Sequence, residues 1–425
     1  MRNAPRLSSD FRTLWRAHTV SQFGVSFSNG ATAYLAVSVL DASAFAVAIL
    51  FGLARLIAAV ISIPVGILVE RARKRPVLVG TDVARSIATA LIPIALFTDS
   101  LSLALLCGLL TVDMFLTIVR AAANAAHLRD LVEDDELTVA FSKFEATNWV
   151  LAALFTPVGG LFIVLFGPTV TLSVDALTYL VSAGLLRRIV KPESESTIVA
   201  TSSIQEFAYE AMGGWRHIWR NRTLRALFLN AMLFGGSLML ISPLLAVLVL
   251  RDLDLEAWHY TFILGVPAVG GVLGTTFAKR VESKLGTNRA VLWLGSIRTF
   301  WSVWIALSPV GLAGFLFVLL LEVLLMFFAG LFNPTFSAFQ VSITERHFLA
   351  RTSAAWRASA MIVQPTFMVL GGALSSWWGM RPTIAFAGSL MIASSLLLPW
   401  PILSGSSRSG FSLLRSQTPR RTAPG

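Results

Sequence analysis

Long apolar runs follow one another along most of the chain, and this feature limits the fold more than any other. A helix that crosses a bilayer core of roughly 30 Å needs about 20 mainly apolar residues, because it rises ~1.5 Å per residue. Hydrocarbon offers no partners for backbone N–H and C=O groups, so only helices and closed barrels can cross it. The runs lack the alternation of polar and apolar residues that barrel strands require. The sequence therefore predicts an all-α membrane protein.

Hydropathy and loop charge together predict twelve transmembrane helices. Hydrophobic residues make up 55% of the chain and charged residues only 13%, whereas a soluble domain carries roughly 25% charged residues. The predicted spans are 15–40, 45–69, 77–98, 101–125, 138–166, 169–189, 225–250, 257–279, 289–308, 313–341, 352–377 and 381–402.

Basic residues gather in alternate loops. The segments 71–75 and 187–191 are rich in Arg and Lys, whereas the loops near Asp41, Asp99 and Pro309 contain almost none. Loops rich in these residues stay in the cytoplasm, so we predict a multi-pass protein of the plasma (inner) membrane with both termini cytoplasmic. The net charge of +11 would by itself suit a nucleic-acid binder. Because the charge follows the loops, no nucleic-acid partner is predicted.

The second half of the chain weakly repeats the first. The stretch 157–160 followed by Gly167 recurs half a chain later as Leu370-Gly371-Gly372 followed by Gly379, with the same spacing of glycines. Three further pairs stand at nearly the same offset: Arg85 and Arg298, Asp113 and Glu322, Asn124 and Asn333. The repeat predicts two pseudo-symmetric six-helix bundles, with a binding site near the midplane between them. The predicted bundles are 1–189 and 225–403.

Two segments lie outside the predicted bundles. Residues 190–224 form the predicted linker, in which 204–222 sets Phe, Met and Trp residues against charged ones. This pattern is typical of an amphipathic helix on the membrane surface, although a plain solvated connector is an alternative. Residues 404–425 are rich in Ser, Gly, Pro and Arg, and we predict a disordered cytoplasmic tail.

The loop after the second predicted span carries a known type of motif. It reads Gly66-Ile-Leu-Val-Glu70-Arg71-Ala-Arg73-Lys74-Arg75-Pro76. This sequence resembles the signature between helices two and three of the major facilitator superfamily, with Glu where the family usually has Asp. Stretches 79–85, 128–137, 175–179 and 214–224 are similar to a branch that holds macrolide-type drug exporters and enterobactin-type siderophore exporters. The resemblance implies the two-bundle fold and secondary active transport by alternating access.

The same loop is predicted to form a cytoplasmic gate. Gly66 permits close helix packing. Glu70, Arg71 and Arg75 can make charge-assisted hydrogen bonds to neighbouring helix ends, and these bonds must break when that side opens. For the intervening residues 73–74, a role as topological anchors is an equal alternative.

A second motif lies in the fifth predicted span. Residues 152–160 resemble the antiporter signature of the superfamily, but Thr156 and Ala152 replace two of its glycines. Pro157 can kink the helix, and Gly159 and Gly160 permit close approach of another helix. The motif favours export by proton exchange, and ordinary packing is the alternative.

Ionisable residues inside the spans are costly, so each is a functional candidate. Asp113 and Glu322 lie in the bodies of the fourth and tenth spans at repeat-related positions. A carboxyl group in a low-dielectric cavity can exchange a proton within the physiological range, as proton coupling requires. Glu145 and Arg55 are weaker candidates for coupling or substrate binding. Arg120 is a further one, two turns or roughly 10 Å from Asp113.

Other charged residues of the spans have structural interpretations. Asp82, Arg85 and Arg120 are predicted near the cytoplasmic helix ends, where they can snorkel or pair. Asp175 is predicted to pair or cap near the start of the sixth span. The candidates for lining the substrate cavity are Gln22, Asn29, Asn230, Asn333 and Gln364.

These features together predict a proton-coupled exporter of a small amphiphilic molecule, such as a drug-like compound or a siderophore. A lipid or lysolipid flippase of the same fold and an uptake symporter are the alternatives, and a channel would need neither the repeat nor the gate. No phosphate loop, metal-spaced Cys or His residues, or Gly-x-Ser-x-Gly motif indicates an enzyme. The predicted partners are the substrate, protons and the bilayer, with no cofactor or metal, and the protein is predicted to be a monomer.

Overall fold

The computed structural model describes residues 8–133, 136–191 and 204–400, and nearly all of them are helical. The predicted tail at 404–425 and part of the predicted linker, 192–203, lie outside the described residues.

The first half of the chain supplies six spans. Its helices are α1 (Ser9–Ser28), α2 (Ala31–Tyr34), the π-helix η1 (Leu35–Val39), α3 (Ala44–Arg71), α4 (Lys74–Phe97), α5 (Leu103–Leu131) and α6 (Leu137–Leu186). The first span consists of α1, α2 and η1. α6 contains two spans, because Gly167 in its middle has a φ of 82° and reverses the chain. Glycine has no Cβ and adopts this conformation without strain.

The second half supplies the other six. Its helices are α8 (Arg222–Val247), η2 (Leu248–Asp252), α9 (Ala257–Gly265), α10 (Pro267–Leu285), α11 (Thr287–Ile297), η3 (Ser302–Leu307), α12 (Leu312–Ile343), η4 (Arg346–Phe348), α13 (Leu349–Trp378), α14 (Met380–Ser394) and η5 (Ser395–Leu397). α9 and α10 form one span, and η2, η3 and η5 extend the helices before them.

The described residues contain ten helical segments that are long and apolar enough to cross a membrane. One of these, Val139–Leu186, is 48 residues long and supplies two spans because of the break at Gly167. The first span, from Ser9 to Val39, begins with a charged turn and is not among the ten. Adding it gives twelve, so the predicted all-α membrane fold is confirmed.

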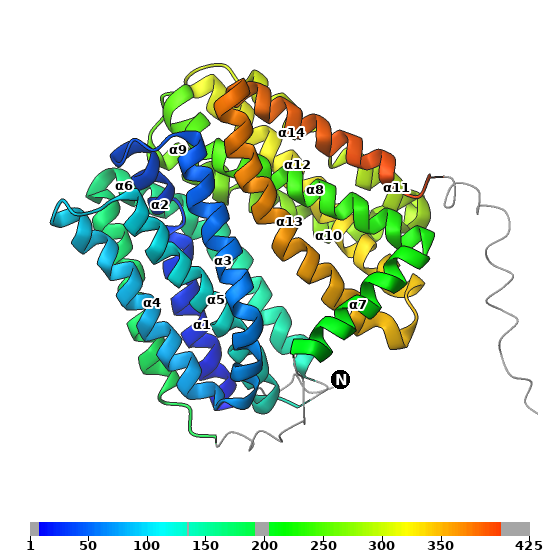
Figure 1. The fold of residues 1–425 in the computed structure, drawn as a ribbon, viewed down its shortest axis with the longest axis horizontal. Coiled ribbons are helices and arrows are strands. Elements are labelled where there is room, and N and C mark those ends of the chain that lie inside the picture. The colour runs from blue at the N-terminus through cyan, green and yellow to red at the C-terminus, as the bar shows by residue number, and fades with distance from the viewer. Residues whose placement is uncertain (1–7, 134–135, 192–203, 401–425) are drawn as a thin grey trace, which may run out of the picture.

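The two halves meet at one end of the helices and separate at the other. We call the end that carries the loops 71–75 and 187–191 the basic end, and the other the opposite end. One hydrophobic core joins the halves and contains Leu50 and Leu240. Toward the basic end each half has its own core, one around Leu78 and one around Leu227. Figure 1 shows the blue-to-cyan half and the green-to-orange half in contact at the top and diverging below.

Rare backbone conformations recur in the two halves. The π-helices η1 and η2 end the first and seventh spans and begin at Leu35 and Leu248. Asp41 and Asp254 follow them with φ values of 49° and 52°, and Gly167 and Gly379 have φ values of 82° and 86°. Residues other than glycine seldom adopt a positive φ. The recurrence of these features at nearly one offset is structural support for two related bundles.

Paired glycines pack in the same way in both halves. A side chain at Gly160 would overlap Thr261 of the second half, and one at Gly372 would overlap Ala48 of the first. The preceding glycines, Gly159 and Gly371, abut the first and seventh spans of their own halves. One glycine of each pair therefore packs within its half, and the other allows close contact between the halves.

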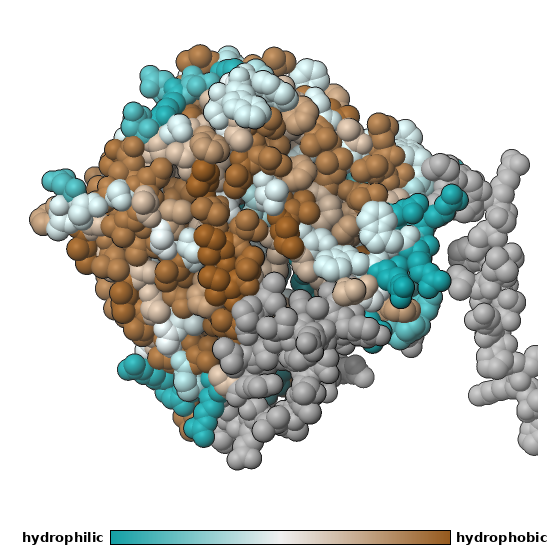
Figure 2. All heavy atoms as spheres, in the orientation of Figure 1, coloured by the Kyte–Doolittle hydropathy of each residue, from teal (hydrophilic) through white to brown (hydrophobic). Residues whose placement is uncertain are grey.

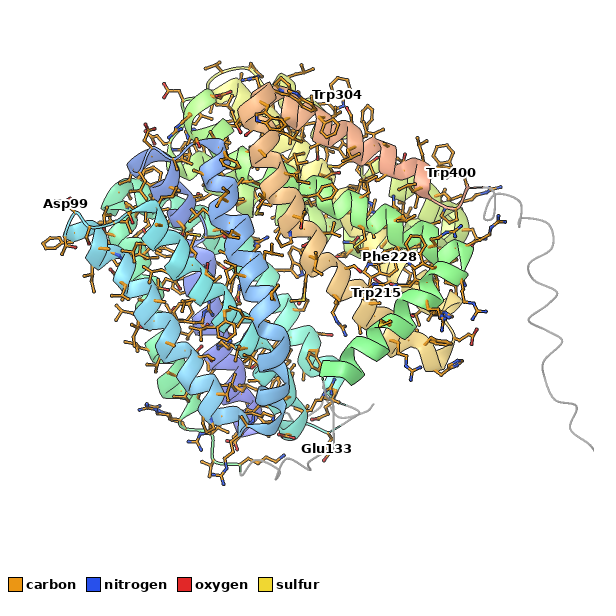
Figure 3. The ribbon with its side chains drawn as sticks, viewed as in Figure 1. Asp99, Glu133, Trp215, Phe228, Trp304 and Trp400 are labelled. Atoms are coloured by element: carbon orange, nitrogen blue, oxygen red, sulfur yellow. The ribbon has the colours of Figure 1, made fainter. Side chains whose placement is uncertain are left out.

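The surface suits a bilayer. Apolar side chains, brown in Figure 2, cover most of the visible outer face, and polar ones gather toward the helix ends. Trp304 lies at the opposite end and Trp400 near the basic end, as Figure 3 shows. Exposed Trp377 and Trp293 add to these groups. Tryptophan favours the two membrane–water interfaces, so the groups mark the membrane boundaries.

A helix occupies the second part of the predicted linker. α7 (Ile204–Arg220) packs against α13, where Trp215 Nε1 donates to Ser359 Oγ at 2.9 Å. Ile218 is fully buried, whereas Met212 and Trp219 are exposed. The helix therefore has one side on the second bundle and apolar groups on another side, available to the membrane surface.

Candidate transport site

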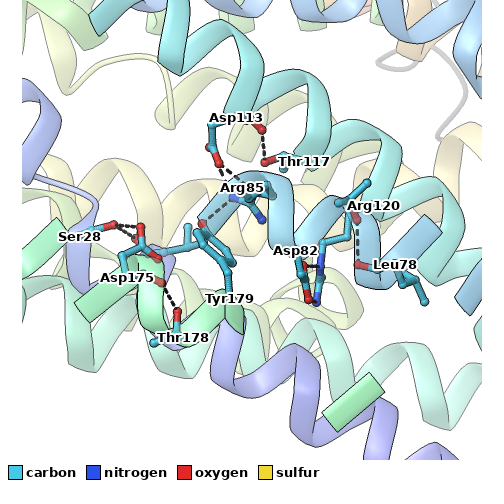
Figure 4. A network of polar contacts seen from close by, with 12 residues as sticks. Ser28, Leu78, Asp82, Arg85, Asp113, Thr117, Arg120, Asp175, Thr178 and Tyr179 are labelled. Atoms are coloured by element: carbon cyan, nitrogen blue, oxygen red, sulfur yellow. Dashed lines mark hydrogen bonds and ion pairs between the residues drawn. The ribbon is translucent and has the colours of Figure 1, made fainter. Parts of the chain in front are cut away.

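A charged group inside the first bundle joins α4, α5 and α6. Arg85 Nε donates to Asp113 Oδ1 at 2.8 Å, and Nη2 donates to the other carboxylate oxygen at 3.4 Å and to Tyr179 Oη at 2.6 Å. The guanidinium also lies 4.3 Å from the centre of the Tyr179 ring. Arg85 is buried, while the side chain of Asp113 keeps 24% exposure. Figure 4 shows Arg85 between its two partners.

A second carboxylate lies on the other side of Tyr179. Asp175 on α6 is buried and accepts a hydrogen bond from Ser28 of α1 at 2.6 Å. No cation of the described residues lies within ion-pair distance of Asp175. We call Ser28, Arg85, Asp113, Asp175 and Tyr179 the carboxylate cluster. All five border a cavity of about 140 Å³, which Asn29, one of the predicted cavity residues, also lines.

Arg120 belongs to a separate polar group nearer the basic end. It donates through Nε to Asp82, whose Oδ2 accepts from Ser182 at 2.6 Å. Asp82 is completely buried and Arg120 is 7% exposed. Arg120 therefore forms its ion pair with Asp82, whereas Asp113 is paired with Arg85. The structural pairing predicted for Asp82 and Arg120 agrees with these contacts.

The equivalent arginine of the second bundle has different partners. Arg298 lies between the rings of Phe234 and Phe332, 3.9 and 3.8 Å from their centres, and donates to Asn230 Oδ1 at 3.0 Å. Asn230 in turn donates to the carbonyl of Ser394 at 2.7 Å and is completely buried. Asn230 thus lies in the interior of the second bundle rather than along the space between the bundles.

Glu322 is buried in α12 without a polar partner. It is 8% exposed and makes no hydrogen bond or ion pair with any described residue. Asp113 and Glu322 are each the eleventh residue of their helices, α5 and α12. The repeat-related positions therefore match in the structure, but only Asp113 is paired with an arginine.

One arginine lies between the bundles. Arg55 of α3 is exposed, and its Nη1 contacts Met239 Sδ of α8 at 3.5 Å. Gln364 of α13 approaches α8 one turn before Met239. A Cβ atom placed at Gly235 would lie 3.4 Å from Gln364 Nε2. Neither Arg55 nor Gln364 makes a hydrogen bond to an oxygen of the described residues, and both are partly accessible.

The remaining candidates are more peripheral. Glu145 is exposed on α6 and accepts from Trp149 Nε1 at 2.9 Å. Gln22 is half-buried on α1 and Asn333 is exposed on α12. In the fifth span, Pro157 touches Gly265 of α9 across the bundle interface, and the helix continues through it.

The predicted gate is only partly visible. Gly66, Glu70 and Arg71 form the last turns of α3, but their side chains lie outside the described residues. Arg75 donates to the backbone carbonyl of Arg187, which ties the start of α4 to the end of α6.

Contacts that close the opposite end are better defined. Arg251 of η2 donates to the carbonyl of Val37 in η1 at 2.8 Å and pairs with Asp41. Arg381 of α14 donates to the carbonyl of Ser308 at 2.7 Å and lies 3.4 Å from Asp252. Polar contacts thus join the two halves, and helices within the second half, at the closed end.

A sequence model of a protein family described as "Transmembrane secretion effector" matches residues 2–406. The chain belongs to this family of major facilitator transporters. No curated protein sequence matches the transporter significantly. The transporter is thus a multi-pass membrane protein that moves a small molecule.

Solved transporters share the fold. A bacterial homologue of the human lysosomal transporter Spinster, in an inward-facing and unoccupied conformation, has 13% identity and a TM-score of 0.68 over 93% of this chain and 96% of its own. A POT family transporter in complex with 5-aminolevulinic acid has 13% identity and a TM-score of 0.71, with coverage of 93% and 96%. The nucleoside transporter NupG has 12% identity and a TM-score of 0.70, with coverage of 94% and 100%.

Of the five members of the carboxylate cluster, the sequence indicates a functional role for Asp113 alone. Arg85 and Asp175 have only structural interpretations in the sequence, and Ser28 and Tyr179 have none. The signal was available, because Asp175 and Tyr179 are one turn apart on one helix face and both lie within an apolar span. The sequence does not show that Arg85 of α4 lies beside this face of α6.

Proposed function

We propose that the transporter exports a small amphiphilic molecule from the cytoplasm in exchange for protons, by alternating access. Basic loops favour the cytoplasmic side, so the separated ends of the bundles would open toward the cytoplasm. The closed ends would then face outward. In this assignment the protein lies in the plasma membrane with both termini inside, and a single chain contains the complete transport path.

The carboxylate cluster is the observation that supports proton exchange. Arg85 supplies one positive charge, which pairs with Asp113 and bonds to Tyr179, and the second carboxyl group, that of Asp175, lies on the other side of Tyr179. With both carboxyl groups ionised the cluster carries one net negative charge, and binding of one proton neutralises it. The cluster is therefore suited to carry one exchangeable proton inside the membrane.

One residue that lines the same cavity is next in sequence to a contact between the bundles. Phe51 of α3 lines the cavity together with Asp113 and Asp175. The next residue, Gly52, lies against Pro365 and Val369 of α13 in the other half. A change in charge at the cluster can therefore shift α3, which helps to hold the opposite end closed. Coupling requires that the proton interact differently with the closed and the open conformation, and such a shift would provide this difference.

The fifth span supports export rather than uptake. Residues 152–160, which resemble the antiporter signature, place Gly159 against Phe27 of the first span and Gly160 against Thr261 of the second half. The motif therefore lies where the bundle that contains the carboxylate cluster contacts the other bundle. This contact must change when the transporter changes between its two conformations.

The test is transport by the purified protein in proteoliposomes with an imposed pH gradient, against a panel of macrolides, siderophores and lysolipids. We expect gradient-driven movement of at least one compound opposite to the protons. Asp113→Asn should reduce it by roughly 10-fold or more, as the loss of an interaction of about 1.4 kcal/mol or more would. Glu145→Gln is the matched control, because Glu145 is exposed and bonds only to Trp149 among the described residues.

The proposal fails if no compound responds to the gradient or if Asp113→Asn transports as well as wild type. Movement of substrate in the same direction as protons would show uptake symport instead.

A further inference from the structure

Arg55 lacks the oxygen partners that the buried arginines of the spans have. Arg357 of α13 also makes no hydrogen bond to an oxygen of the described residues, but Arg55 is the one that contacts the other half. Arg85 and Arg120 are paired with aspartates, Arg298 bonds to an asparagine, and Arg251 bonds to a carbonyl and an aspartate. Among the described residues, the polar contact of Arg55 is the thioether of Met239, a weak acceptor. A guanidinium has five N–H donors, so most of those of Arg55 have no acceptor among the described residues.

The position of Arg55 is central. It is the twelfth residue of α3, which begins at the opposite end, so it lies roughly 16 Å along the helix and near the middle of a bilayer core. One turn earlier, Gly52 packs against α13, and the contact between the halves is tight. Arg55 lies on the basic side of this contact, and its side chain is exposed and reaches the other bundle.

A second unsatisfied polar group converges on the same place. Gln364 immediately precedes Pro365, whose carbonyl faces Gly52. Its amide approaches α8 at Gly235, and Met239, the contact of Arg55, is one turn further along that helix. Gln364 makes no hydrogen bond to a described residue and is only half-buried. A guanidinium and an amide from different bundles thus approach α8 one turn apart, with most of their donors available.

The contacts around these two groups are apolar. Met239 lies across from Arg55, and Val369 of α13 packs against Gly52, one turn before Arg55. A hydrocarbon or aromatic group suits such neighbours, while a carboxylate would satisfy the donors through charge-assisted, bidentate hydrogen bonds. No described carboxylate is within ion-pair distance of Arg55, so the guanidinium is available to an anionic ligand.

We propose that Arg55 and Gln364 bind the carboxylate head of an anionic amphiphile, at the apex of the space between the bundles. The inference rests on the proposed function in that this amphiphile is the transported substrate. The ligand contacts α3 of the first bundle and α8 and α13 of the second. Its binding and release therefore change the interactions of both halves.

The test uses two fluorescent probes with one ring system, 1-pyrenebutyrate and its uncharged primary amide. Equilibrium binding to the purified full-length transporter in detergent is followed by anisotropy, without a pH gradient. Wild type should bind the carboxylate roughly 10-fold or more tighter than the amide, because a charge-assisted bidentate contact is worth more than about 1.4 kcal/mol. Arg55→Gln should lose this preference while binding the amide within about 2-fold of wild type.

Two further variants sharpen the assignment. Arg55→Lys should keep part of the preference, since it keeps the charge but not the fork geometry. Arg289→Gln is the control, because it removes an equally exposed arginine from the first turn of α11 at the basic end. Thermal unfolding of each variant shows that the fold is retained.

The proposal is overturned if wild type binds the anion no better than the amide, or if Arg55→Gln keeps the preference. The outcome is separable from that for proton exchange. Asp113→Asn should keep the anion preference even when gradient-driven transport is lost. If wild type shows the preference but no response to a pH gradient, the anion site stands and the proton-exchange proposal falls.

Discussion

The two bundles of this transporter have the same backbone plan but use equivalent positions differently. Arg85 and Arg298 are equivalent, yet the first is paired with Asp113 and Tyr179 and the second lies between two phenylalanine rings. At the offset that relates the two halves, three polar members of the carboxylate cluster have apolar counterparts: Ser28 and Ile241, Asp175 and Ala387, Tyr179 and Met391. The first bundle thus has buried charged and polar groups where the second has apolar side chains.

The largest effect should come from removing the central arginine of each bundle. Arg85→Met removes the cation of Asp113, close to a second carboxyl group, that of Asp175, that has no cation within ion-pair distance among the described residues, and breaking a buried pair costs about 3–5 kcal/mol. Arg298→Met removes a hydrogen bond and two cation–π contacts but leaves no anion behind, at a cost of about 1–3 kcal/mol. Thermal unfolding in detergent measures both. Equal losses of stability in the two variants would mean that the carboxylate cluster depends on Arg85 no more than the aromatic pair depends on Arg298.

The next effect concerns proton-driven transport. Asp175→Asn should lower gradient-driven flux by roughly 10-fold or more, because it removes one of the two carboxyl groups of the carboxylate cluster. Glu322→Gln should change it by less than about 3-fold, because Glu322 has no cation or hydrogen bond to lose among the described residues. The measurement is proton-driven flux in proteoliposomes that contain each variant. A larger loss in Glu322→Gln would move the coupling site to the second bundle.

A smaller effect is expected where the bundles are alike. Gly160→Ala and Gly372→Ala each place a methyl group against the partner half, and such overpacking costs about 1–3 kcal/mol. Both should shift the transporter toward opening at the opposite end, seen as faster labelling of a cysteine introduced at Val37, which is buried where the halves meet. Gly80→Ala is the control, since no atom lies within 4 Å of a side chain placed there. A response in only one of the two would contradict the symmetric interface.

The smallest effect should come from the ion pair at the closed end. Arg251 and Asp41 have side chains that are 34% and 93% exposed. Exposed pairs contribute about 0–1 kcal/mol, so Asp41→Asn should raise the labelling rate at the opposite end by no more than about 5-fold. Arg251→Gln should do slightly more, because it also removes the hydrogen bond to Val37. A change beyond about 10-fold would make this pair the principal lock.

Hydropathy predicted most of the fold because membrane crossing depends on local composition. The predicted spans lie within or close to the observed helices, apart from the early start of the first at Ser9. The first turns of that helix carry Asp10, Arg12 and Arg16, which hide the boundary from a hydropathy window. The division into two halves was predictable too. Gly167 and Gly379 stand at equivalent positions, because each half needs a glycine with a positive φ where the chain reverses between two spans.

The site was less predictable because it depends on which helix faces meet. Asp113 was correctly placed in the body of a span, but its pairing with Arg85 of the preceding span was not evident from the sequence. Asn230 was predicted to line the cavity and is instead inside a bundle. An amide facing a cavity and one facing a neighbouring helix look the same in sequence, and only packing separates them.

The glycines between the bundles have a mechanical consequence. Gly52, Gly160 and Gly372 meet backbone, a methyl group or a threonine side chain of the other half rather than interlocking long side chains. At these three contacts no long side chain of one half is inserted into the other. Separation of the halves there requires no side chain to leave a pocket, so these contacts resist an opening of the closed end less than interlocked side chains would.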